Sequence, residues 1–250
     1  MNSSFRRISA LTIRNLKEIL RDPLSLIFTI GMPLFLEILF YFIFHKMTAQ
    51  FQMMYLAPGI VAFSQSFLSL FVGMLISIDR NSSFLTRLYV TKAKSHEFII
   101  AYILSVIPIV LFQSILFFGV GAIIDTSIWS IGILFAILMS VYTSIFFIVT
   151  GILIGTICNE RAVGGIASIF ISGQSLLSGM WFPLDGFDKT IITIMNALPF
   201  RNANMLIQNT MLDISDGLNQ LLFPMLIVLG YTVLNSIIAI FLYKKKMTAK

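Results

Sequence analysis

The chain alternates long apolar blocks with short polar stretches, and the length of each block predicts a helix that crosses a membrane. Six blocks stand out, at residues 24–44, 55–78, 98–124, 128–157, 162–181 and 221–243. About 20 apolar residues, rising 1.5 Å each, span a hydrocarbon core of roughly 30 Å. The pattern therefore predicts an all-α integral membrane protein with six transmembrane helices, forming one transmembrane domain over residues 1–250.

Two further segments are apolar on one side only. Residues 1–22 place Phe5, Leu11 and Leu16 near one face with basic residues elsewhere, which predicts an amphipathic interfacial helix along the membrane surface. Residues 182–220 hold two short apolar helices interrupted by Pro199, each too short to span. We expect them to form an outer re-entrant helical hairpin between spans five and six.

The polar stretch 79–97 separates spans two and three and is the richest internal cluster of positive charge. The positive-inside rule places such a loop in the cytoplasm. Of the 17 Lys and Arg residues, only Lys46, Lys189 and Arg201 then fall on the outer side. We expect a multi-pass protein of the cell (plasma) membrane with cytoplasmic N- and C-termini.

Composition agrees with this class. Hydrophobic residues make up 58% of the chain and charged residues 11%, against about 25% charged residues in soluble domains. The net charge of +6 comes from cations at the membrane boundaries, so nucleic-acid binding is not expected. The single Cys158 excludes a disulfide within the chain, and no spacing of Cys and His predicts a metal site.

Glu37 is unusual because it lies inside the first span, where a carboxylate costs about 2.5 to 3.5 kcal/mol. One interpretation places it on a substrate path together with Gln65, Gln113 and Gln174. The alternative is a hydrogen bond between Glu37 and a polar neighbour such as one of these glutamines at a helix interface, or a position of Glu37 near the outer headgroups.

Span four contains Gly151 and Gly155, whose spacing allows close approach of two helices. They form either a dimer seam or ordinary packing within the chain.

No phosphate-binding loop of the type G-x-x-x-x-G-K-[ST] occurs, and no nucleophile has a credible base nearby. The chain is therefore predicted to be a transport subunit, not an enzyme.

Three motifs occur in a characteristic order: RDPLSLIF opens span one, SSFLTRLYVTKAKSHEFI follows span two, and SGMWFPLDGFDKTIITIMNALPF follows span five. In this order the chain resembles the type-2 family of ATP-binding-cassette (ABC) export permeases, including multidrug and antibiotic exporters. The resemblance implies a dimer of identical chains that docks ABC ATPase subunits carrying ATP and Mg. It also implies that residues 79–97 are the cytosolic coupling loop, with ATPase contacts at Arg80, Arg87, Leu88, Thr91, Lys92 and Ser95.

The resemblance implies ATP-driven export of an amphipathic or hydrophobic compound such as a drug, antibiotic, lipid-like molecule or peptide. No cofactor is expected on this chain itself, and membrane lipid is an expected partner. Two alternatives stay open: a permease for lipid-linked polysaccharide, and a proton- or ion-coupled secondary carrier with Glu37 as its coupling residue.

Overall fold

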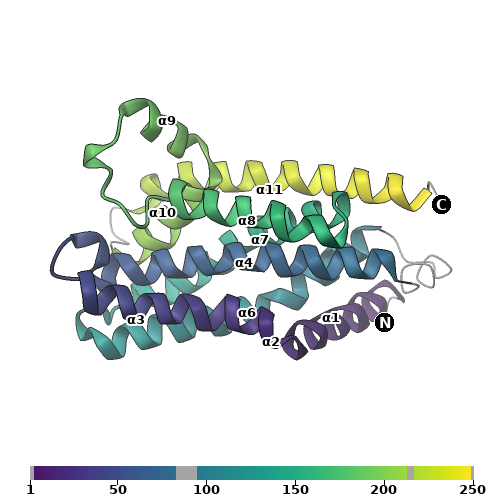
Figure 1. Ribbon diagram of the computed structural model, residues 1–250, viewed down its shortest axis with the longest axis horizontal. Coiled ribbons are helices and arrows are strands. Elements are labelled where there is room, and N and C mark those ends of the chain that lie inside the picture. The colour runs from purple at the N-terminus through teal and green to yellow at the C-terminus, as the bar shows by residue number, and fades with distance from the viewer. Residues whose placement is uncertain (1–2, 83–94, 213–216, 249–250) are drawn as a thin grey trace.

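The computed structural model describes residues 3–82, 95–212 and 217–248, and this part of the chain contains helices and no strand. The long helices run side by side, and the two marked chain ends lie at the same end of the bundle (Figure 1). The helices are α1 (Ser3–Arg21), α2 (Pro23–Leu26), α3 (Met32–Phe44), α4 (Met53–Asn81), α6 (Ser95–Ile124), α7 (Gly132–Ile157), α8 (Glu160–Leu177), α9 (Lys189–Ala197), α10 (Pro199–Leu212) and α11 (Gly217–Thr248). Between them lie a π-helical segment η1 (Ile27–Gly31) and the 3-10 turns η2 (Ala49–Phe51), η3 (Thr126–Ile128) and η4 (Leu184–Gly186).

Five stretches of the described chain are long and apolar enough to cross a membrane: Pro23–Phe44, Met53–Arg80, His96–Ile124, Gly132–Ile157 and Gln220–Leu242. The remaining expected span corresponds to α8, which has 18 residues and begins with charged Glu160 and Arg161. It packs on α4 and α7 within the bundle. The arrangement is compatible with six spans, and the sixth crossing stays a prediction.

Local capping sets the helix ends where the apolar pattern alone does not. Asp22 accepts a hydrogen bond from the Leu24 amide at 3.1 Å, and Pro23 follows at the first helical position. Asp125 accepts one from Ser127 at 3.0 Å and holds η3, so α7 begins at residue 132 and not at 128. The cap therefore shortens the predicted fourth span by four residues.

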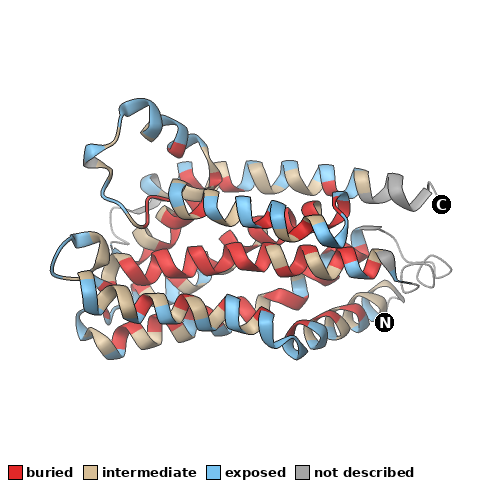
Figure 2. Cartoon of the chain, in the orientation of Figure 1, coloured by how far each residue is buried: buried red, intermediate tan, exposed pale blue. Residues whose placement is uncertain are grey.

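α4 lies at the centre of the bundle. Its membrane-spanning window is mostly buried, whereas few residues are buried in those of Pro23–Phe44 and α11. Figure 2 shows the same contrast, with buried residues along α4 and exposed ones along α11. In a chain of this composition, the exposed apolar faces suit contact with lipid or with another permease chain.

The two glycines of span four pack within the chain. A Cβ atom added to Gly151 would lie 2.5 Å from the carbonyl oxygen of Ser69, and one added to Gly155 would overlap the carbonyl oxygen of Gly73. Both contacts join α7 to α4. The close approach that this spacing predicts is used for ordinary packing inside the chain.

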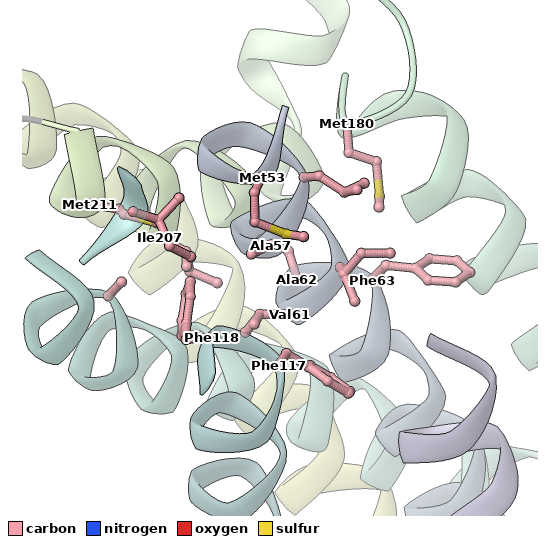
Figure 3. Packing of buried hydrophobic residues seen from close by; sticks show 14 of the residues in the cluster. Met53, Ala57, Val61, Ala62, Phe63, Phe117, Phe118, Met180, Ile207 and Met211 are labelled. Carbon is pink, nitrogen blue, oxygen red and sulfur yellow. The ribbon is translucent and has the colours of Figure 1, made fainter. Parts of the chain in front are cut away.

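The segment after α8 is divided between the core and the periphery. Ile207 and Met211 of α10 belong to one buried cluster with Met53 of α4 and Phe118 of α6 (Figure 3). In contrast, Met195 is the buried residue of α9, which protrudes at the end of the bundle away from the chain termini (Figure 1). α10 is thus fixed by the core, and re-entry of the pair into a membrane stays a prediction.

Candidate coupling site

α1 presents more than one apolar face. Leu11 and Ile19 are buried against the bundle, whereas Phe5 and Leu20 are exposed. Phe5 and Leu11, expected near one apolar face, therefore differ in burial, and the expected separation of apolar and basic residues is wrong in detail. The reason is a set of buried carboxylates on the neighbouring helices, which draw two of the α1 arginines inward.

The first of these carboxylates is Asp79, in the last turn of α4 and 1% exposed. Arg14 of α1 donates to both of its oxygens, Nη2 to Oδ1 at 2.7 Å and Nη1 to Oδ2 at 2.5 Å. The hydroxyl of Tyr102 on α6 also donates to Oδ2 at 2.5 Å. One carboxylate thus joins three helices, in the bidentate geometry that gives strong charge-assisted bonds.

The second carboxylate is Glu97, in the first turn of α6 and 1% exposed. Arg7 donates to it through Nε at 3.0 Å and Nη2 at 2.8 Å. Arg7 and Arg14 are two helical turns apart, so they extend from the same side of α1. The end of α4 and the start of α6 are the two stems of the loop 79–97. Each stem is therefore fixed to α1 by a two-bond ion pair.

Both arginines are held in their charged form. The hydrogen bonds that Arg7 donates to Glu97 raise the pKa of its guanidinium. Burial lowers the pKa of Arg14, but the hydrogen bond and charge of Asp79 outweigh burial and leave that pKa raised. The two arginines stay partly exposed whereas their carboxylates are buried, so removing either arginine leaves a buried carboxylate without this ion pair, which is destabilising.

Arg80 connects α4 to the end of α7. Its guanidinium donates to the carbonyl oxygens of Gly155 at 3.2 Å, of Cys158 at 2.7 Å and of Thr156. A cation placed on the last carbonyls of a helix also complements the helix dipole. Arg80, expected to contact an ATPase, is here bonded to this chain's own backbone.

The other expected coupling residues, Arg87, Leu88, Thr91 and Lys92, lie outside the described residues. Ser95 is the first residue of α6, and its side chain is likewise not described. What the structure describes is the frame that holds this loop: α1, the end of α4 and the start of α6. Sequence analysis missed Arg7, Arg14 and Tyr102 as parts of that frame.

Glu37 makes no hydrogen bond to the three glutamines that one interpretation places with it on a substrate path. Neither of its carboxyl oxygens has a hydrogen-bond partner, and the side chain is fully buried. A Cβ atom added to Gly121 of α6 would lie 3.2 Å from Oε1 of Glu37, so this carboxyl group packs close to α6. The expected hydrogen bond between Glu37 and one of these glutamines is therefore wrong, whereas a position near the outer headgroups and a place on a substrate path stay predictions.

The three glutamines instead bind neighbouring helices. Gln65 donates to the Ser140 carbonyl oxygen at 2.8 Å and accepts from Thr143 at 2.9 Å. Gln113 donates to Ser64 at 3.1 Å, and Gln174 donates to the Ala62 carbonyl oxygen at 3.5 Å. All three are buried inside the chain. These bonds tie α6, α7 and α8 to α4, as polar side chains do between membrane helices.

Long apolar helices around a buried central helix, with charged groups gathered at one end, define a multi-pass helical membrane protein. The family model of the ABC-2 type transporter matches residues 6–212, so the chain belongs to this family and is a membrane permease of an ABC transporter. The match begins in α1 and ends in α10. A comparison with curated proteins gives no match.

Proposed function

We propose that this chain is the permease of an ATP-driven exporter and that an ABC ATPase docks on its loop 79–97. The two bidentate pairs between α1 and the stems of that loop carry the proposal. They make α1, the end of α4 and the start of α6 one mechanical unit. A displacement of the loop would therefore be transmitted to α4, the central helix, because the stems cannot move independently of α1.

The expected cargo is amphipathic or hydrophobic. An apolar groove of about 510 Å³ lies between α1, the first span and α6, and includes Leu16, Ile30 and Phe112. Its apolar side chains complement an apolar compound that arrives from the lipid. Two copies of the permease, each with its own ATPase, form the proposed assembly.

The first test is a mild-detergent pull-down of the tagged chain from its native host, followed by mass spectrometry. We expect a stoichiometric partner that carries a phosphate-binding loop. Recovery of a stable permease without any ATPase would contradict the proposal and favour a secondary carrier.

A variant series on this complex separates docking from coupling. Arg87→Glu with Lys92→Glu reverses the loop charge and should abolish ATPase co-purification. Arg14→Gln should retain the ATPase but lose most of the permease-dependent change in its hydrolysis rate, because Asp79 then no longer binds α1. Lys17→Gln, which removes an exposed cation from the same helix, is the matched control. Unchanged ATPase binding by the loop variant would overturn the assigned docking site.

A further inference from the structure

A second polar feature lies at the end of the bundle away from the chain termini. It is a cavity of about 330 Å³, within the size range of small-molecule sites. Its walls come from the η2 turn, the start of α4, the end of α8, the η4 turn and α10. The lining includes Gln50, Tyr55, Gly179, Leu184, Arg201 and Asn204.

The walls of this cavity are fixed by local structure. α8 ends at Leu177, and Gly179 then adopts a φ of 71°, a left-handed conformation that glycine takes without strain. The Gln50 side chain donates to the Gly179 carbonyl oxygen at 2.7 Å and links the η2 turn to the end of α8. On the other side, α10 is held by the buried cluster of Figure 3.

Two polar atoms on side chains of the lining have no hydrogen-bond partner. Nη1 of Arg201 is buried and makes no hydrogen bond, and no ion pair to Arg201 occurs among the described residues. Asn204 is 4% exposed, and its Oδ1 atom is also unpaired. Its Nδ2 atom donates to the Ser178 carbonyl oxygen at 3.4 Å. One donor and one acceptor at the cavity therefore remain unsatisfied.

The position of Arg201 makes this arrangement costly. It is the third residue of α10, where the helix dipole disfavours a cation and favours an anion. Burial also lowers the pKa of its guanidinium, and among the described residues no carboxylate offsets this shift. An anion near Arg201 would satisfy both the side chain and the positive end of the helix.

We propose that this cavity binds an organic phosphate that carries a neighbouring hydroxyl group. Arg201 donates to a phosphate oxygen, Asn204 Oδ1 accepts from the hydroxyl, and Leu184 contacts the carbon skeleton. A phosphate is favoured because the cavity lies beside the first turn of α4 and the end of α8, the level at which lipid phosphates meet the ends of apolar helices. The headgroup of phosphatidylglycerol and soluble glycerol phosphate share this chemistry. The site is independent of the proposed export and requires no ATPase.

The test measures binding to the full-length purified chain. In an uncharged detergent, calorimetry follows glycerol 1-phosphate, with glycerol as the uncharged control. In nanodiscs, native mass spectrometry counts retained phosphatidylglycerol against phosphatidylcholine. Arg201→Gln should weaken binding at least about tenfold, since it removes a charge-assisted hydrogen bond. Lys189→Gln removes an exposed cation from the same end of the bundle and should change nothing.

Each outcome is decisive. Binding of glycerol 1-phosphate that depends on Arg201 identifies a soluble ligand, and retention of phosphatidylglycerol alone identifies a lipid headgroup. If the intact chain binds neither, or if Arg201→Gln binds as well as the intact chain, the proposal is overturned. Thermal unfolding of Arg201→Gln without ligand checks the fold, and the melting temperature should not fall because Nη1 has no partner to lose.

Discussion

At the scale of single residues, the protein contains two opposite kinds of buried carboxyl group. Asp79 and Glu97 are each held by an arginine and carry their charge within two-bond ion pairs. Glu37 is equally buried and has no hydrogen-bond partner. The first kind fixes helices together, whereas the second contributes the free-energy cost of burying a polar group without a compensating hydrogen bond.

This contrast predicts opposite effects of the same substitution. Glu37→Met replaces an unpartnered carboxyl by an apolar side chain of similar length and should stabilise the protein by about 1 to 3 kcal/mol. Glu97→Met strands the guanidinium of Arg7 and should destabilise it. Melting temperatures of both variants in the same detergent provide the measurement. A fall for Glu37→Met as large as that for Glu97→Met would reveal a bonding partner of Glu37.

At the scale of elements, apolar length predicted the long helices well, because membrane-crossing segments must satisfy their own backbone groups. Their ends were predicted less well, since these depend on single residues such as Asp125 and Gly179. The frame of the coupling loop was missed for a different reason. Arg14 and Asp79 are 65 positions apart, and no local pattern shows that they meet.

The seam between α4 and α7 gives a prediction at this scale. Gly155→Ala would force a methyl group onto the backbone of Gly73 and should destabilise the protein by about 1 to 3 kcal/mol, as overpacking does. Gly164→Ala on α8 is the matched control, because nothing lies within 4 Å of an added Cβ there. Equal melting temperatures for the two variants would argue against the close contact.

At the scale of the whole molecule, the chain ends and the stems of the 79–97 loop lie at one end of the bundle, and α9 lies at the other (Figure 1). The excess of Lys and Arg near the first end predicts that it faces the cytoplasm. The cavity beside α10, for which we propose binding of an organic phosphate, would then face outward. The orientation itself is a prediction that follows from the charge distribution.

Cysteine labelling tests this orientation. In a Cys158→Ser background, Ser82→Cys should react with a membrane-impermeant maleimide only in inside-out vesicles, because it lies at the cytoplasmic end. Thr190→Cys at the start of α9 should react only in intact cells. Both positions are exposed, so access across the membrane decides the result. Labelling of both from the same side would refute the topology.

The ion pairs of α1 also determine the order in which the protein is completed during synthesis. α1 is made before α4 and α6, but its arginines bind carboxylates that follow 65 and 90 positions later. Until Glu97 has been translated, Arg7 lacks its carboxylate, and of the two ion pairs only Arg14–Asp79 can form. Docking of α1 is therefore completed only after α6 has been made, and a nascent chain that stops before α6 can hold α1 through one of the two ion pairs, Arg14–Asp79.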